Sequence, residues 1–451
     1  MKDRYTLKNL PLYLSWLIGL ILVLLPFHAF LTVWASSLAG HYTLLRLWKE
    51  FLLIPLSLGA TYLLVRDKVL LRRFKASWLV RLIIVYALLL VASGLIALAG
   101  HHVTSKAMWY GLLVNLRFLV FFLVVWIIAS KSDWLRAKWR LLLLGPAIVV
   151  SAFAIIQFWV LPYDFLKHFG YGDNTIAPYE TINHNLQHLR VGSTLRGANP
   201  LGAYLLLPLS GLAVLLFKNK KRRFDGLLFG IGLLLALVFS FSRSAWIGAV
   251  LSLLVIIWLL IKSHQTKKLL AIAAAAVVVV GAGLGFSLRH NPSFQNTFLH
   301  SQTNSAVPQS SDEQHGSAFK QAIKDIYHQP LGGGVGTAGP QSYYNHNQQR
   351  IAENYFLQIG QEAGLLAIAL FVAINVLVAR ELWRIILMSR SGHKKDGDSL
   401  ALWLLASFVG LTFINLLSHA WTDDSLAYLW WGLAGIAIGV LLSDNKHKQI
   451  K

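Results

Sequence analysis

Long blocks of apolar residues, separated by polar connections, run along nearly the whole chain. Blocks of about 20 apolar residues match the length of helix that crosses the hydrocarbon core of a membrane. In lipid, a continuous helix satisfies its own main-chain hydrogen bonds, so these blocks are expected to be helical. The pattern predicts an all-α polytopic membrane protein with about a dozen transmembrane helices, at residues 11–34, 44–65, 79–100, 107–129, 141–161, 199–217, 225–241, 244–261, 268–287, 354–379, 400–418 and 425–442.

Two of the polar connections are long. Residues 162–198 form the first, and residues 288–353 form the second, which is the largest polar segment of the chain. Within it, Ala318 to Tyr327 is predicted to form an amphipathic helix, and the glycine-rich run that follows Pro330 indicates a flexible bend. We therefore divide the chain into spans one to nine (1–287), a large loop (288–353), and the last three spans with a tail (354–451).

The basic residues indicate how the predicted helices are oriented. The chain holds 41 lysines and arginines, and 28 of them fall in alternate connections or at the two ends of the chain. Because connections rich in Lys and Arg stay in the cytoplasm, both termini are predicted to be cytoplasmic and both long connections extracytoplasmic. The net charge of +22 then reflects membrane topology, so we expect membrane lipids as partners and no nucleic acid.

The first candidate binding segment is Ser193-Thr-Leu-Arg196-Gly-Ala-Asn199-Pro200-Leu-Gly202, at the predicted outer mouth of the sixth span. Pro200 suits the first turn of a helix. The free N–H groups of such a turn, together with a guanidinium, form a site for an anion. Arg196 is therefore a candidate ligand for an anion, and Arg190 is a second. The alternative is that Arg196 anchors the helix end to lipid headgroups.

Two further arginines lie near or within the predicted spans. Arg243, in the short connection Ser240-Phe-Ser242-Arg243-Ser244-Ala-Trp246, lies close to membrane depth, where a charge needs a polar cavity or a bound anion. Snorkelling to the headgroups is the alternative for Arg243. Arg117 lies inside the fourth span and needs a partner, which is either a ligand or a structural carboxylate such as Glu50.

A polar stripe leads into the tenth predicted span. On a helix, Glu353, Asn354, Gln358 and Glu362 would fall along one side by their four-residue spacing. A polar stripe that runs into the bilayer must face protein or water. Glu353 is thus a candidate general base, or the ion-pair partner of an arginine, and the other three are candidate site residues beside it.

Histidines and acids elsewhere give weaker signals. His184 and His188 have the spacing of a helical metal site, but neither an HExxH sequence nor a cysteine accompanies them. We therefore predict no metal and no cofactor, and we retain His188 as a candidate site residue. The group His419, Trp421, Asp423 and Asp424 precedes the last span, either as part of a site or as an interfacial belt.

In their order and spacing, these segments resemble the O-antigen ligase/polymerase superfamily of bacterial polysaccharide assembly. The resemblance covers most of the chain and is strongest from about residue 190 to 440. It rests on Arg196-Gly-Ala-Asn199-Pro200, on Ser242-Arg243-Ser244-Ala-Trp246, and on the large loop that ends in Pro330-Leu-Gly-Gly-Gly-Val-Gly before Glu353-Asn354-Tyr355 and Glu362-Ala-Gly364.

The resemblance implies a membrane glycosyltransferase of the bacterial cytoplasmic membrane, acting in lipopolysaccharide or other polysaccharide biosynthesis. Such an enzyme moves an undecaprenyl-diphosphate-linked glycan onto a hydroxyl of a glycan, lipid or protein acceptor at the outer face, without a metal. The resemblance places Arg196 and Arg243 on the diphosphate, and Glu353 stands where the family ligases have a histidine. With this chemistry, Arg190 and Arg117 are further candidates for the diphosphate. The candidates for orienting the acceptor are Asn354, Gln358, Glu362 and His188.

Ligation is the first expectation and repeat-unit polymerisation is the alternative within the superfamily. A polar-solute transporter or flippase, which would carry charged groups near the bilayer midplane, is the alternative from another class. A structural scaffold for an assembly complex is a third.

Overall fold

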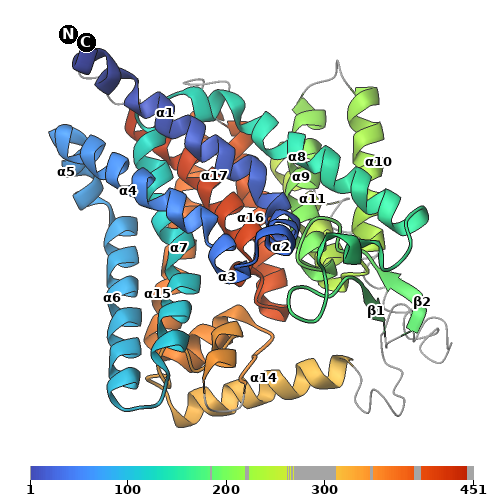
Figure 1. The fold of residues 1–451 in the computed structure, drawn as a ribbon. Coiled ribbons are helices and arrows are strands. Elements are labelled where there is room, and N and C mark those ends of the chain that lie inside the picture. Colours follow the sequence, from blue (N-terminus) through green and yellow to red (C-terminus); the bar gives the residue numbers. More distant parts are fainter. Residues whose placement is uncertain are drawn as a thin grey trace.

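The computed structural model describes residues 2–182, 185–218, 223–261, 263, 265, 268, 311–345, 349–390 and 398–443. These residues are predominantly helical (Figure 1). The first half contains α1 (Lys2–Leu24), α2 (His28–Ala39), α3 (Tyr42–Leu45), α4 (Trp48–Arg66), α5 (Lys68–Ala76), α6 (Trp78–Ala99), α7 (Ser105–Ala129) and α8 (Trp134–Trp159). The second contains α9 (Ala198–Lys218), α10 (Arg223–Phe239), α11 (Arg243–Leu260), α14 (Ser311–His328), α15 (Tyr355–Arg390), α16 (Asp398–Leu417) and α17 (Asp424–Ser443).

The predicted spans that fall within the described residues all contain a helix. Among those residues, 9 helical segments are long and apolar enough to cross a membrane, and α10 adds a shorter apolar stretch, Phe224–Phe239. The chain is therefore a polytopic α-helical membrane protein. The ninth predicted span, 268–287, and the first part of the predicted large loop lie outside the described residues, apart from Lys268.

Three of the predicted spans are interrupted. The first changes direction at Leu25–Phe27, a short 3-10 turn whose Pro26 has no N–H to donate to a helix. The second begins in the short helix α3 and is broken at Arg46–Leu47, before α4; His41, which precedes α3, has a left-handed backbone with φ of 59°. The tenth runs on to Arg390 as α15 and contains a break at Gly364.

Glycines bring the central helices into close contact. In α17, a Cβ at Gly435 would lie 2.8 Å from the carbonyl oxygen of Phe122 on α7, and one at Gly439 would lie 2.8 Å from that of Trp126. A stripe of small residues lets two helix backbones approach closely in a membrane, where tight packing replaces much of the hydrophobic drive. The α7–α17 pair is thus the centre of the bundle, and the candidate site lies around one end of it.

One end of the bundle gathers connections that are far apart in the sequence. Thr104 Oγ1 donates to the carbonyl of Tyr344 at 2.8 Å, Arg190 Nε donates to that of Ser240 at 3.2 Å, and Tyr355 N donates to that of Ser418 at 3.2 Å. The connections predicted to share one side of the membrane therefore meet at one end, which is covered by α14 and lies opposite the start of α1 (Figure 1).

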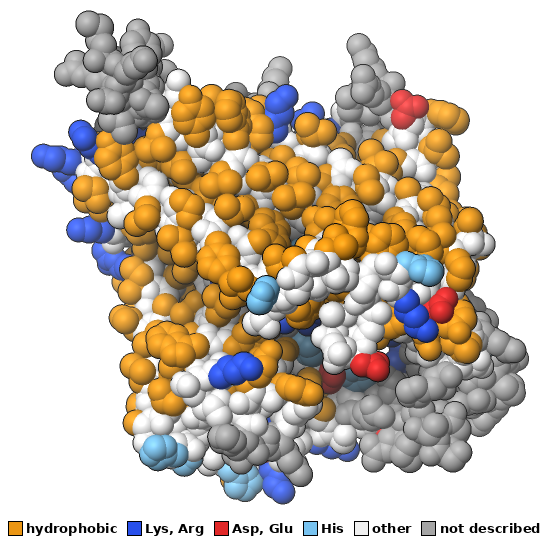
Figure 2. All heavy atoms as spheres, viewed as in Figure 1, with side chains coloured by type: hydrophobic (Ala, Val, Ile, Leu, Met, Phe, Trp, Pro, Cys, Tyr) orange, Lys and Arg blue, Asp and Glu red, His pale blue; other side chains and the backbone are white. Residues whose placement is uncertain are grey.

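The surface pattern fits a helix bundle in a membrane. Figure 2 shows apolar side chains covering the middle of one face, while Lys and Arg side chains gather at its upper left, over α5. Helix α5 carries basic residues in its last turn, and Asp67 caps its N-terminus by accepting from Val69 N and Leu70 N. The basic connection between α4 and α6 thus forms a short amphipathic helix, α5, at the end of the bundle away from α14.

Both long connections contain regular secondary structure, and the first holds strands that the all-α prediction did not include. Strands β1 (Glu180–Ile182) and β2 (Asn185–Arg190) form an antiparallel hairpin in which Glu180 pairs with Arg190. His188 therefore lies on a strand, and the helical spacing assumed for it does not apply. The amphipathic helix in the second connection is α14, which begins earlier than the predicted Ala318.

The glycine-rich run after α14 is a packed turn rather than a flexible bend. Gly332, Gly334 and Gly336 all have positive φ, and a Cβ at Gly336 would lie 2.9 Å from the backbone of Ala107 on α7. The turn is also hydrogen-bonded to the break in α15, since Gly333 N donates to the carbonyl of Gln361 at 2.8 Å. Glycine is required here because the backbone is left-handed and its neighbours are close.

Candidate active site at the α14 end

Arg196 lies immediately before α9, as the sequence predicts, but the helix N-terminus beside it is partly occupied. Ala198 N donates to Glu180 Oε1 at 3.2 Å, so a carboxylate of β1 takes one of the N–H groups that were expected to bind an anion. Gly197 makes room for this carboxylate, because a Cβ at that position would overlap it. The helix terminus is therefore less available to an anion than the Arg196 guanidinium is.

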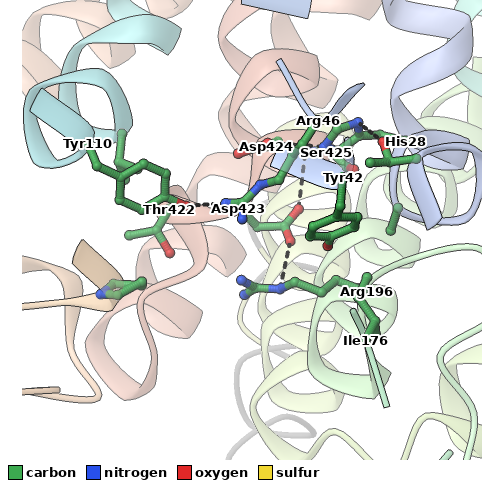
Figure 3. A pocket seen from close by; sticks show the side chains of 14 residues that line it. His28, Tyr42, Arg46, Tyr110, Ile176, Arg196, Thr422, Asp423, Asp424 and Ser425 are labelled. Carbon is green, nitrogen blue, oxygen red and sulfur yellow. Dashed lines mark hydrogen bonds and ion pairs between the residues drawn. The ribbon is translucent and has the colours of Figure 1, made fainter. Parts of the chain in front are cut away.

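The Arg196 side chain lines a cavity of about 250 Å³ together with Glu353, His419 and Asp423. Arg196 Nε lies 4.0 Å from Asp423 Oδ2, and Figure 3 shows the arginine reaching toward that carboxylate. Across the same cavity, Glu353 Oε2 lies 3.9 Å from His419 Nδ1. With 48% of its side chain exposed, Arg196 keeps surface on which to bind a ligand.

Glu353 does not belong to the helical stripe that its spacing suggested. Asn354 is the residue that caps α15: its Oδ1 accepts from Leu357 N at 3.0 Å and its Nδ2 donates to the carbonyl of Leu416 at 2.9 Å. Glu353 precedes this cap and has a left-handed backbone, with φ of 51°. A non-glycine residue in that region is strained, and such residues concentrate at functional sites. The strained backbone carries Glu353 into the cavity, away from the helix face.

Burial shapes the protonation of the two possible proton acceptors. It raises the pKa of Glu353 above that of an ordinary carboxylate, while His315, whose Nδ1 lies 3.7 Å from Glu353 Oε2, opposes the shift. Burial also lowers the pKa of His419 to about 4, and the nearby charge of Arg196 adds to this effect. At neutral pH, His419 is therefore uncharged, and Glu353 takes up a proton more readily than an exposed carboxylate does.

Arg190 and Arg243 lie beside this cavity. Arg190 Nη2 donates to Asn199 Oδ1 at 2.7 Å, so its guanidinium connects β2 to the first turn of α9. Arg243 begins α11; burial lowers the pKa of Arg190, and the charge of Arg243 adds to this effect. The residue after it, Ser244, lines the cavity along with Asn199. His188 lies two residues before Arg190 on β2 and so points to the same face of the strand.

Arg117 is part of a buried cluster of charges. Its Nη1 lies 3.0 Å from Glu50 Oε1, the structural partner considered from the sequence, and its Nη2 contacts Asp424. Lys49 Nζ lies 2.7 Å from Asp424 Oδ2 and 3.1 Å from Glu50 Oε2, and His28 Nε2 lies 3.2 Å from Asp424 Oδ2. Cations and carboxylates alternate in this cluster, so Arg117 has a structural role and does not line the cavity.

Glu362 and Gln358 also lie away from the cavity. Glu362 is fully buried and accepts hydrogen bonds from Asn115 Nδ2 at 2.9 Å, Gly336 N at 2.8 Å and Gln341 Nε2 at 2.6 Å. It therefore fastens the glycine-rich turn to α7 and α15. Gln358 is buried under Gly339, where a Cβ would overlap its side-chain amide. Both residues hold structure, and neither is placed to orient an acceptor.

Sequence reasoning missed Arg46. It lies just after α3, and with Tyr42 and Arg196 it lines the pocket of Figure 3; its Nη2 donates to the Tyr110 hydroxyl. The same pocket reaches Asp423, so the two arginines flank one small cavity of about 50 Å³. The only sequence signal was a basic residue near the end of a predicted span, which by itself does not distinguish a site residue from an anchor at the membrane surface.

Among the described residues, no group of three or more His, Cys, Asp and Glu side chains is arranged to hold a metal ion. Residues 227–372 match the family model of O-antigen ligase, a range that includes α11, α14, Glu353 and the first half of α15. None of the curated proteins compared with the chain matches it. The family match confirms the resemblance to the O-antigen ligase/polymerase superfamily.

Proposed function

We propose that this O-antigen ligase-like chain transfers a glycan from an undecaprenyl-diphosphate donor to an acceptor hydroxyl. The reaction takes place at the extracytoplasmic face of a bacterial cytoplasmic membrane, and both termini lie in the cytoplasm. The observation that carries the proposal is the cavity at the α14 end, where Arg196 lies with Glu353 and His419. A cation for a diphosphate and two possible proton acceptors thus share one space.

The proposed transfer requires few groups beyond Arg196, Glu353 and His419. The acceptor oxygen attacks the anomeric carbon, the bond from that carbon to the diphosphate oxygen breaks, and negative charge grows on the diphosphate. Arg196 stabilises that charge as it develops, in a partly buried site where electrostatic interactions are strengthened. Arg243 and Arg190, beside the cavity, supply further positive charge for the lipid diphosphate.

Glu353 accepts the proton that the acceptor hydroxyl loses. Its elevated pKa brings it nearer to the pH at which a general base is most effective. His419, held neutral and 3.9 Å from Glu353, positions the carboxylate. Glu353 thus takes the place of the histidine of the family ligases as the proton acceptor, and this step uses no cofactor.

The test uses a strain that lacks the native gene and carries Arg196→Lys, Arg243→Lys or Glu353→Gln. Lysine keeps the charge but loses the two-pronged guanidinium, so each variant is expected to reduce glycan output. Arg350→Lys and Asp173→Asn, two exposed positions, are the matched controls. Wild-type output from all three site variants at matched expression would overturn the proposal.

The same strain separates the two reactions of the superfamily. When the gene is deleted, accumulation of full-length lipid-linked chains indicates a ligase, and accumulation of single repeat units indicates a polymerase. We propose ligation, with polymerisation as the alternative. Counterflow of a labelled polar solute in liposomes without any acceptor would instead favour the transporter class.

A further inference from the structure

A second, larger cavity opens on the other side of Arg196. Its volume is about 700 Å³, within the range of sites that hold small organic ligands. The start of α3, the start of α7, the turn Pro340–Tyr344 and residues 174–176 form its walls. We call it the aromatic groove. Because Arg196 also lines the 250 Å³ cavity with Glu353, the two spaces meet at this side chain.

The charged side chains of the groove are all positive. Arg46, Lys106 and Arg196 line it, and none of the described lining residues is an Asp or Glu. Arg196, where the groove meets the smaller cavity, has Asp423 Oδ2 at 4.0 Å from its Nε, whereas Arg46 and Lys106 lie against aromatic rings. A wall with cations and without acids selects a ligand that carries negative charge.

Aromatic rings make up much of the remaining wall, and they hold the cations in place. Lys106 Nζ lies 4.2 Å from the centre of the Tyr344 ring, and the Arg46 guanidinium lies 5.4 Å from that of Tyr110. The rings of Tyr110 and Tyr344 pack edge to face, 5.3 Å apart. Ring faces that pack on the C–H surfaces of sugars, alternating with fixed cations, suit a saccharide chain better than a single small anion.

We propose that the aromatic groove binds an anionic saccharide, the segment of the glycan substrate that extends past Arg196. This inference rests on the proposed function, because it assigns the groove to the substrate of the same transfer. The negative charge is a carboxylate of a uronic acid or a phosphate substituent, and the shared feature is an anion on a sugar ring.

Two exposed residues of the groove give variants that leave the fold intact. Lys106 is exposed, and the Tyr343 side chain is 70% exposed. Lys106→Gln removes one cation and Tyr343→Ala removes one ring. Lys320→Gln and Tyr327→Ala, at exposed positions of α14 outside the groove, are the matched controls.

The experiment measures binding of end-labelled tetrasaccharides by fluorescence anisotropy, using the full-length protein in phosphatidylcholine nanodiscs. The probes are tetragalacturonate, maltotetraose bearing a 6-phosphate, and plain maltotetraose. At least one anionic probe is expected to bind about tenfold or more tightly than plain maltotetraose, and Lys106→Gln and Tyr343→Ala are each expected to weaken it by about tenfold. The anionic probe that binds more tightly identifies the source of the charge.

Equal affinity for all three probes, or unchanged affinity in both groove variants, would overturn the inference. So would loss of probe binding when phosphatidylglycerol is added to the nanodiscs, because the groove would then be a site for lipid headgroups. Glu353→Gln separates this inference from the proposed function. If only the groove assignment is wrong, that variant still loses glycan output; if only the transfer is wrong, the anionic probe still binds while Glu353→Gln retains output.

Discussion

Glu353 and His419 face each other at the α14 end of the bundle, with 3.9 Å between Oε2 of the carboxylate and Nδ1 of the imidazole. They come from different connections, one before α15 and the other after α16. Nδ1 of His419 is buried and makes no hydrogen bond to the described part of the chain. The pair therefore forms a small polar unit whose two members have different roles in the proposed transfer.

Glu353→Gln is expected to reduce glycan transfer more than His419→Gln does. Loss of a general base typically costs about 10²- to 10⁴-fold in rate, whereas loss of a positioning neighbour is expected to cost about tenfold. Single-turnover transfer rates with the purified variants measure the difference. An equal or greater loss in His419→Gln would make the imidazole the proton acceptor.

The rate of transfer is expected to fall on the acid side at a higher pH than for an ordinary carboxylate base. Burial raises the pKa of Glu353, so the active carboxylate form is lost as pH falls through that raised value. His315 opposes the shift when charged, and His315→Gln is therefore expected to move the acid limb to still higher pH. A pH–rate profile of the wild-type protein and of His315→Gln measures the shift. An acid limb that moves to lower pH in the variant contradicts the prediction.

Arg117→Met is expected to destabilise the protein by about 3–5 kcal/mol, because it leaves Glu50 and Asp424 short of a buried positive partner. Thermal unfolding in detergent measures the loss, with the exposed Arg350→Met as control. A variant of normal stability that fails only in donor binding would instead show that Arg117 contacts the diphosphate.

Gly336→Ala is expected to destabilise the α14 end by about 1–3 kcal/mol, since its backbone is left-handed with φ of 103° and a Cβ would press on α7. Gly316→Ala, on α14 with open space around it, is the matched control and should be neutral or stabilising. Equal unfolding temperatures for both variants would mean that the turn accommodates the added Cβ without a loss of stability.

Hydropathy predicted the spanning helices well because a chain in lipid satisfies its backbone only inside continuous helices. It failed where a helix is interrupted. Pro26 was visible in the sequence, yet the short 3-10 turn around it depends on how the chain packs against its neighbours. The break at Gly364 is likewise set by the glycine-rich turn that docks there, a contact between elements that no local pattern records.

The candidate site was only partly predictable. Arg196 and Glu353 were found because a charge at a helix mouth stands out against apolar sequence. Four-residue spacing wrongly grouped Glu353 with Glu362, because the cap at Asn354 places the first outside the helix and the second in the core. Arg46 was missed because it is far from Arg196 in the sequence, and only the folded chain brings the two residues to the same pocket.

The break in α15 has a consequence for how the protein is assembled. At this break, the carbonyl oxygens of Gln361 and Glu362 accept from Gly333 N and Gly334 N, and Leu365 N donates to the carbonyl of Pro330. If α15 entered the bilayer before the turn docked, these groups would meet hydrocarbon unpaired, at a cost of several kcal/mol each. We therefore expect that α15 reaches its final position in the bilayer only after the turn that follows α14 has docked against the break at Gly364.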